Sequence, residues 1–227
     1  MNRSAGLSYL GNSDPIDPIL KLLIQTWYFP QEKNKDVVKH LGLNNLTPNE
    51  ISSMWKHMWF AKEMRQKEID QMLKKQFEHH IDHYAQLVEN TDHTFSIWEK
   101  LGLMILFDQV TRNVYRNSAK AYMYDKYAIV IAREFMEMFD LLPYVVKVTV
   151  ALCYVHSEDI SDHIAIEHIP KKLSESVFNH PMVNQSLSAI MANHRDRIET
   201  FGRVPERNRY LGRVSSTEEK VYMKSFN

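Results

Sequence analysis

The chain is poor in the residues that punctuate or cross-link a fold, with one cysteine, six glycines and eight prolines in 227 residues. Because Cys153 is alone, no disulfide can form within the chain, which suits a reducing compartment. The scarcity of glycine and proline argues against a β-sandwich or barrel, which needs a turn every ~8–12 residues. Basic and acidic residues balance at 28 each, so the chain as a whole has no electrostatic attraction to nucleic acid.

Long apolar runs are also missing, since none approaches the ~20 residues that span a bilayer. The first 13 residues lack the apolar core of a secretory signal and resemble an organelle transit segment only in having one arginine, three serines and no acid. We therefore expect no transmembrane segment and a cytoplasmic or organelle-matrix location, not a secreted protein. Residues 1–13 are expected to form a flexible N-terminus, and residues 14–227 a single all-helical domain.

What the chain does have is helical periodicity. Residues 60–89 contain no glycine or proline, and their apolar positions, from Phe60 and Met64 to Leu87, recur every three to five residues, which predicts a long amphipathic helix. Further helices are predicted over 19–29, 47–60, 94–109, 117–139, 141–157, 183–202 and 216–223. Segment 141–157 is rich in β-branched residues and a strand is conceivable, but no partner strand is in sight, so a helix is favoured.

Helix ends are marked by capping residues. Thr47 is a predicted N-cap, with Pro48 at the first helical position and Glu50 three residues after the cap, and Ser216 and Glu219 have the spacing of a capping box. Ser118 is a plausible N-cap, and Gly202 is a predicted C-terminal stop. Their agreement with the apolar periodicity makes the predicted fold class all-α.

The first polar group follows the most apolar helix, in the stretch "FDQVTRNVYR". Asp108, Gln109, Arg112, Asn113 and Arg116 are expected to leave that helix on a turn-like segment. If the segment stays helical, positions 108 and 112 share a face and can form a buried ion pair. Such a pair either fixes one packing arrangement or forms the wall of a polar pocket, and both readings stay open.

The second group is "HSEDISDH". His156 and His163 are seven residues apart, on one face if the segment is helical, and with Asp159 they could bind a metal or act as acid and base. The alternative reading makes residues 157–159 the acidic first turn of a helix. A further pair, His79 and His83, lies among charged residues and is better explained as a solvated helix face. No metal site and no cofactor is therefore predicted. The apolar neighbours of Cys153 predict a buried thiol and disfavour a nucleophile.

The third group is "HRDRIETFGRVPERNRYLGR", residues 194–213, which holds six of the eleven arginines and no lysine. Guanidinium groups bind carboxylates and phosphates in a two-point fork, which lysine cannot do. Acidic residues dilute the positive charge, and only two aromatic residues interleave, so nucleic acid is a disfavoured partner. The arginines expected on a non-helical segment after Gly202 are Arg203, Arg207, Arg209 and Arg213.

Three ordered motifs carry a resemblance to a known family. "LFDQVTRNVYRN", "HSEDISDH" and "FGRVPERNRYLGRVSSTEE" are similar, in order and separation, to the motifs of the family named domain of unknown function 924. The resemblance covers nearly the whole chain and implies antiparallel helix pairs of tetratricopeptide-like, right-handed arrangement. Trp98, Leu101 and Gly102 match the start of a tetratricopeptide repeat, but the rest of that pattern fails. The family's name implies no activity.

The resemblance carries over specific motif positions, but the chain departs from the pattern inside them. Asn117 stands where glycine is usual and Glu206 where histidine is usual, so a chemistry of relatives that needs this histidine would be lost here. The carried-over positions that we take as a candidate ligand pocket are Asp108, Gln109, Arg112, Asn113, Arg116, His156, Glu158, Arg203, Arg207, Asn208 and Arg213.

Two functions from different classes fit these residues. The first is a helical binding or scaffold protein, a complex subunit or a binder of acidic peptides or small anions. The alternative is an enzyme that acts on a small anionic metabolite through Asp108, Arg112, His156, Glu158 and Arg203. A pocket of ~300 Å³ or more with two arginines pointing inward unpaired would favour a small-molecule site. Arginines fully paired with Asp108 and Glu158 would favour a purely structural ionic network.

Overall fold

The computed structural model describes residues 16–29, 43, 46–175 and 180–225, so the predicted flexible N-terminus lies outside the described residues. The described residues form helices and no strand, as predicted. The α-helices, in chain order, are α2 (Pro18–Tyr28), α4 (Pro48–Met54), α5 (Glu63–Glu89), α6 (Ile97–Met104), α7 (Thr111–Val114), α8 (Asp125–Glu137), α9 (Tyr144–Val155), α10 (Ile160–Ala165), α11 (Ile169–Ser174), α12 (Pro181–Phe201), α13 (Asn208–Leu211) and α14 (Thr217–Lys224). Shorter elements are the π-helical turns η1 (Trp55–Trp59) and η2 (Ile105–Val110) and the 3-10 turns η3 (Ala119–Tyr122), η4 (Phe139–Leu141) and η5 (Pro205–Arg207).

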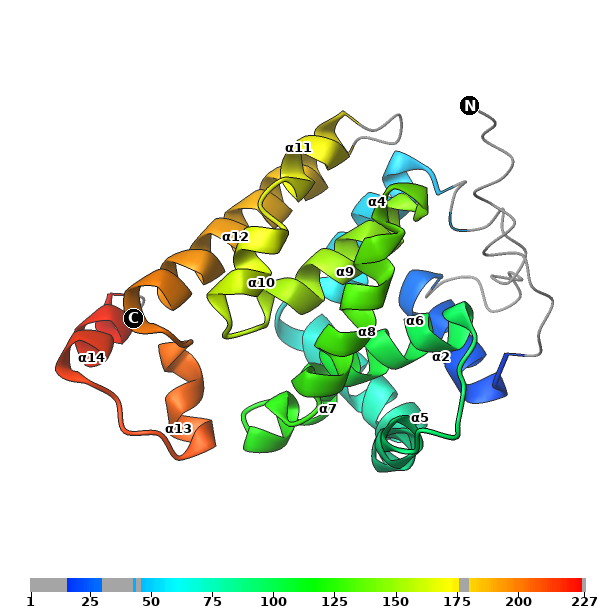
Figure 1. The fold of residues 1–227 in the computed structure, drawn as a ribbon, viewed down its shortest axis with the longest axis horizontal. Helices are drawn as coiled ribbons and strands as arrows, with labels where there is room; N and C mark the ends of the chain where they lie inside the picture. The colour runs from blue at the N-terminus through cyan, green and yellow to red at the C-terminus, as the bar shows by residue number, and fades with distance from the viewer. Residues whose placement is uncertain (1–15, 30–42, 44–45, 176–179, 226–227) are drawn as a thin grey trace.

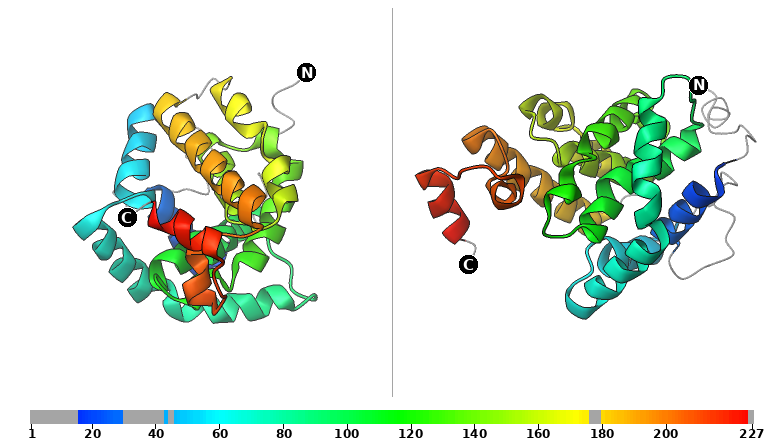
Figure 2. Two further views of the ribbon diagram at one scale, coloured as in Figure 1. Left: turned by 90° about the vertical axis from the view of Figure 1, so that its left-hand side faces the viewer. Right: turned by 90° about the horizontal axis from the view of Figure 1, so that it is seen from below.

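The helices surround a central pair, α8 and α9, that pack against each other (Figure 1). On one side α6 packs on both α2 and α8, and α5 packs on α7. On the other side α12 packs on α9, α10 and α11. The chain then turns back beyond the end of α12, and α13 and α14 lie together at this end of the molecule (Figure 2). None of the described helices is both long and apolar enough to cross a bilayer.

The contact between α2 and α6 depends on a glycine. A Cβ atom on Gly102 would lie 3.0 Å from Cβ of Leu20, closer than side chains normally approach, so a larger residue there would require the two helices to shift apart slightly. Asp17 caps α2 by accepting from the backbone N–H groups of Ile19 and Leu20 at 2.8 and 3.2 Å. Tyr84 of α5 donates to the same carboxylate at 2.5 Å, so the cap also ties α2 to α5.

Most predicted helix ends are confirmed. Thr47 and Ser216 both make complete capping boxes, and Gly202 ends α12 in the left-handed conformation with φ 66°. The prediction for Ser118 is wrong in its mechanism. Ser118 precedes η3, but its hydroxyl donates backwards to the carbonyl of Tyr115 at 2.8 Å and caps no N–H group.

The long helix begins three residues later than predicted, at Glu63, because η1 and a turn precede it. Its buried face is the predicted one from Ile69 onwards, but Met64 is 75% exposed, so its assignment to the apolar face was wrong. The aromatic residues before the helix form a separate cluster. Trp59 stacks on Trp27 of α2 with ring centroids 6.2 Å apart, which fixes η1 against the core.

Segment 141–157 is a helix and not a strand, as predicted. All but one of the 12 residues of α9 are buried, the exception being Lys147. Thr149 shares a 2.7 Å hydrogen bond with Tyr28, and Cys153 is buried, which confirms the prediction for the thiol. Burial raises the pKa of Cys153 well above its ordinary 9.0, which disfavours the thiolate that a nucleophile needs.

The stretch expected to be turn-like is helical as far as Val114, which corrects the prediction. It passes through η2, where the π-helical turn takes in one residue more than an α-turn. All six residues of η2 are buried, including Asp108 and Gln109. The turn therefore places a carboxylate at the centre of the molecule, where its hydrogen-bonding needs must be met by other side chains.

Candidate functional site

Asp108 is the centre of a buried polar cluster. It is 1% exposed, and its Oδ1 lies 3.0 Å from Nη1 of Arg112, one turn later on the same helix. The side-chain amide of Gln109 donates to its Oδ2, and Nδ1 of His156 lies 2.8 Å from its Oδ1. The predicted pair between positions 108 and 112 is thus present, because this segment stays helical.

The charges of this cluster follow from its burial. Burial alone would raise the pKa of Asp108, but the Arg112 guanidinium and His156 outweigh it and hold the pKa well below its ordinary 3.8. Burial, together with the positive charge of Arg112, lowers the pKa of His156. Asp108 is therefore an anion beside a neutral imidazole. Since an anion can only accept, Nδ1 of His156 carries the hydrogen, and Nε2 keeps a free lone pair.

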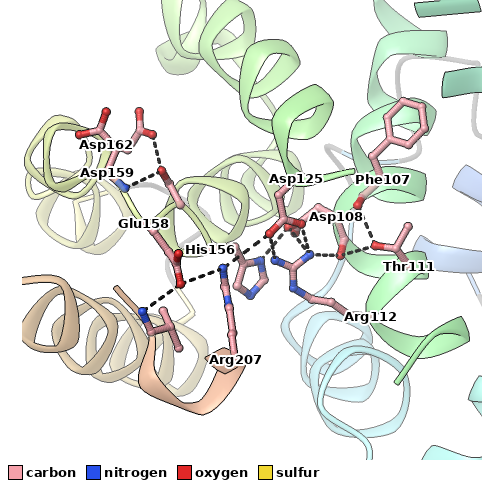
Figure 3. Close-up of polar contacts among 12 residues, drawn as sticks. Phe107, Asp108, Thr111, Arg112, Asp125, His156, Glu158, Asp159, Asp162 and Arg207 are labelled. Atoms are coloured by element: carbon pink, nitrogen blue, oxygen red, sulfur yellow. Dashed lines mark hydrogen bonds and ion pairs between the residues drawn. The ribbon is translucent and has the colours of Figure 1, made fainter. Parts of the chain in front are cut away.

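Arg112 is held by two carboxylates, which occupy both terminal nitrogens of its guanidinium. Its two terminal nitrogens donate to the two oxygens of Asp125 at 2.9 Å each, in addition to the contact with Asp108. Burial would lower the pKa of Arg112, but both carboxylates raise it, so the guanidinium stays charged. Figure 3 shows Arg112 between the two aspartates. Arg112 therefore links Asp108 and Asp125 within the protein and is not available to a ligand.

Arg207 is different, because it is buried without hydrogen bonds. It is 7% exposed, and the nearest carboxylate oxygens, on Asp125 and Glu158, lie 3.7 and 3.9 Å from its Nη1 (Figure 3). No residue that the structure describes accepts a hydrogen bond from its guanidinium, which lies over the Tyr122 ring, 4.9 Å from the centroid. Burial and the neighbouring Arg112 lower its pKa. Arg207 thus makes two long ion pairs with the described residues and leaves the hydrogen-bonding capacity of its five N–H donors open.

Glu158 fastens the segment after Gly202 to the end of α9. Its carboxylate accepts two hydrogen bonds from Arg213, at 2.8 and 3.0 Å, and a third from the backbone N–H of Val204 at 2.9 Å. Burial would raise the pKa of Glu158, but these donors together with Arg207 lower it, so it is ionised. We call residues 202–219 the C-terminal strap. Contrary to prediction, Arg207 and Arg209 lie in short helical turns, η5 and α13.

Arg203 and Asn208 belong to a separate network inside the strap. Arg203 donates to both oxygens of Glu219 at 2.7 and 2.9 Å, and the side-chain amide of Asn208 donates to the same carboxylate at 3.1 Å. Hydrogen bonds from Arg203 lower the pKa of Glu219 from its ordinary 4.5 to about 2, although burial opposes this. These two residues, predicted for the pocket, hold the strap together instead.

Arg203→Ala is expected to lower the melting temperature by a few degrees, because Glu219, 2% exposed, would keep its negative charge and lose its main partner. The measurement is a thermal melt at pH 7 followed by circular dichroism. A melt within one degree of the unchanged protein would contradict the assignment.

The pH dependence provides the control. A carboxylate whose pKa is lowered by folding stabilises the folded state above its unfolded pKa, near 4.5, and this contribution is lost as the pH falls towards about 2. The difference in melting temperature between the two proteins should therefore shrink over this range. A constant difference would indicate that Arg203 acts by packing alone.

The remaining predicted residues lie nearer the surface. Arg116 donates to both oxygens of Asp70 of α5 at 2.7 and 2.9 Å and to the side-chain oxygen of Asn113 at 3.1 Å. Asn113 in turn donates to the backbone carbonyl of Gln109 at 2.7 Å. The structure thus divides the residues predicted for the pocket into four groups. These are the cluster around Asp108, the bonds from Arg213 and Val204 to Glu158, the network of Arg203 with Glu219, and the outer pair of Arg116 and Asn113.

Three cavities meet at His156. The first, of about 390 Å³, is also lined by Arg207, Tyr122 and Glu206 and by His194 of α12. A second of about 310 Å³ lies towards Asp125 and Glu158, and a third of about 420 Å³ lies towards η1. Since His156 lines all three, its free Nε2 is placed among spaces large enough for a small molecule.

The cavities include residues that were not predicted for the pocket, namely Tyr122, Asp125, His194 and Glu206. The rings of His156 and His194 lie edge to face, with centroids 5.9 Å apart. Burial lowers the pKa of His194 to about 2, so this second imidazole is neutral too. His194 was visible in the arginine-rich stretch, but Asp125 and Tyr122 carry no local signal, because their roles come from contacts across the fold.

In the stretch "HSEDISDH", His156 and His163 do not share a helix face. α9 ends at Val155 and α10 begins at Ile160, so His156 and His163 lie on different elements, which corrects the prediction. His163 donates through Nε2 to the carbonyl of Ser157 at 2.9 Å. The alternative interpretation placed residues 157–159 in the first turn of a helix. The helix begins at Ile160 instead, and Asp159 is its N-cap. Within the described residues, no three His, Cys, Asp or Glu side chains are grouped to hold a metal ion.

Comparison with known proteins agrees with the fold and the three motifs. Residues 25–227 match the family described as bacterial protein of unknown function (DUF924), and the chain belongs to this family. A solved structure, that of a protein of unknown function from Agrobacterium tumefaciens, superposes with a TM-score of 0.59 at 25% identity, covering 74% of this chain and 89% of that one. A search of curated proteins found no match.

Proposed function

We propose that the protein binds a small anionic molecule in the 390 Å³ cavity, with Arg207 as the principal contact for the anionic group. The observation that carries the proposal is the state of Arg207, a buried guanidinium whose hydrogen-bond donors have no acceptor among the described residues. Leaving a buried charged group without hydrogen bonds is costly. An oxyanion in the cavity would accept the two-point hydrogen bonds that guanidinium groups form.

The surroundings of Arg207 support a bound ligand over a purely internal role. The Tyr122 ring covers one face of the Arg207 guanidinium, and the N–H groups at the edge of the guanidinium remain able to donate to a ligand. Arg209, which lies over the Tyr210 ring at 4.4 Å, lines the same cavity and is exposed. By contrast Arg112, Arg203 and Arg213 are committed to carboxylates. The site therefore combines an internal ionic network with one arginine available to a ligand.

Arg207→Gln is expected to abolish ligand binding. In a thermal-shift titration with succinate, glutarate, citrate, inorganic phosphate and a short Asp/Glu peptide, a probe at a hundred times its dissociation constant stabilises the protein by about 2.7 kcal/mol, which is visible as a rise of several degrees. The rise should be absent in Arg207→Gln. The variant should fold, because it loses no hydrogen bond from the side chain, only the ion pairs of 3.7 and 3.9 Å with Asp125 and Glu158, which keep Arg112 and Arg213 as closer partners.

The matched control is Arg195→Gln, which removes an arginine from α12 that pairs with the exposed Glu167 and Glu199. It should keep the full response to the probes. If no probe raises the melting temperature, or if Arg207→Gln responds as the unchanged protein does, the proposal fails. A peptide that binds much more tightly than the free dicarboxylates would instead indicate a protein partner that presents an acidic segment.

An enzyme is the second candidate function, favoured by the pair of Asp108 and His156. A neutral imidazole oriented by a buried carboxylate at 2.8 Å, with Nε2 free, has the geometry of a general base. Its nucleophile would have to be water or a hydroxyl of the ligand, since Cys153 is buried and Ser157 donates to Asp162 at 2.6 Å. Proton NMR spectra of each bound probe over hours would show conversion, and His156→Asn should prevent it.

A further inference from the structure

The cavity that contains Arg207 also encloses polar atoms of the opposite kind. Oε2 of Glu206 and Nδ1 of His194 are both buried and have no hydrogen-bond partner among the described residues. Both side chains line the 390 Å³ cavity, together with Arg207 and His156. Buried polar atoms are nearly always hydrogen-bonded, so these two side chains, which both line the cavity, are the first candidates for hydrogen bonds to a ligand.

The partner must donate hydrogen bonds to Glu206. Its other oxygen, Oε1, already accepts from Nε of Arg197 at 2.9 Å, so the carboxylate is held in place and its Oε2 is left over. An ionised carboxylate oxygen can only accept. The neutral rings of His156 and His194 each have one nitrogen that can accept, and the arginines on the same wall, Arg207 and Arg209 among them, contribute donors. The cavity wall thus carries both hydrogen-bond donors and acceptors.

A cationic donor suits the carboxylate of Glu206 and the neighbouring imidazole nitrogens better than a hydroxyl does. An ammonium group has three donors and a positive charge, so it can bond to Oε2 of Glu206 and to an imidazole nitrogen at once. Charge-assisted hydrogen bonds to a carboxylate are also about twice as strong as neutral ones. Among anions of a size that fits about 390 Å³, this selects those that also carry an amine.

We infer that the ligand of this cavity carries an amine together with its anionic group, as amino acids and amino phosphates do. The inference rests on the proposed anion site, in which Arg207 holds the carboxylate or phosphate. Glu206 is then the residue that selects for the amine.

Matched pairs of probes test the inference. Isothermal titration calorimetry compares L-aspartate with succinate, L-glutamate with glutarate, and phosphoethanolamine with ethyl phosphate. In at least one pair the amine-bearing member should bind about tenfold or more tightly than its partner, the value of one charge-assisted hydrogen bond. Glu206→Gln should reduce this ratio to within about twofold. Glu199→Gln, which changes an exposed carboxylate paired with Arg195, should keep it.

The outcomes separate the inference from the proposal on which it rests. Equal affinity within every pair, with binding itself intact, would overturn amine selection and leave the anion site standing. A ratio that survives in Glu206→Gln would overturn the role of Glu206. Failure of all six probes to bind the unchanged protein would overturn the anion site, and the inference with it.

Discussion

Asp108→Asn is expected to lower the free energy of unfolding by about 3–5 kcal/mol, the cost of removing one partner from a buried ion pair. The amide would face Arg112 without the negative charge that balances the guanidinium, and would be a weaker acceptor for His156, at a position 1% exposed. Urea denaturation at pH 7, followed by circular dichroism, measures the change.

Asp125→Asn is the matched control. It removes the other carboxylate from the same arginine, but at a position 22% exposed, where water can replace part of the lost interaction. Its cost should therefore be clearly smaller. If the two variants lose the same stability, or if Asp108→Asn loses the less, the ion pair at the centre of η2 does not have the structural role described here.

Phe107→Ala is expected to cost about 3–5 kcal/mol, the range for truncating a fully buried aromatic side chain. Phe107 is 0% exposed, and its ring stacks against Tyr124 at 6.0 Å and contacts Tyr127 at 5.3 Å. Those tyrosines donate in turn to Asp82 and Glu89 of α5. The cavity left behind would therefore loosen η2 next to Asp108 and its attachment to α5.

The same urea experiment measures Phe107→Ala, with Phe107→Leu and Val130→Ala beside it. The leucine variant fills part of the space and should cost less. Val130 is 54% exposed on α8, so its truncation should change stability by no more than about 0.5 kcal/mol. A Phe107→Ala protein that unfolds like Val130→Ala would show that this part of the core repacks freely.

The fold class was predictable because its signals are local. The capping boxes at Thr47 and Ser216 and the stop at Gly202 each depend on residues within one turn of the chain. The π-helical turn η2 was not predictable. Nothing in "ILFDQV" distinguishes it from an α-turn, and in the structure this segment packs against α2, α5 and α8, which are distant in the sequence.

The candidate site was predictable in part for the same reason. Asp108 and Arg112 are one turn apart, so their pairing could be anticipated from spacing alone. The partner of Arg203 could not, since Glu219 lies 16 residues away on the other side of two short helices. Asp125 likewise joins the centre only through the packing of α8 on η2.

The C-terminal strap is attached to the rest of the molecule by contacts between residues that are far apart in the sequence. The bonds from Glu158 to Val204 and Arg213 join positions 46 and 55 residues apart, whereas Asp108 and Arg112 meet within one helical turn. Closing such long loops costs entropy that local pairing avoids. The bond between His156 and Asp108 also joins positions 48 residues apart, so the imidazole pair and the strap carry similar loop-closure costs. Of these contacts only the Asp108–Arg112 pair is local, and the cavity is complete only when distant parts of the chain have closed around it.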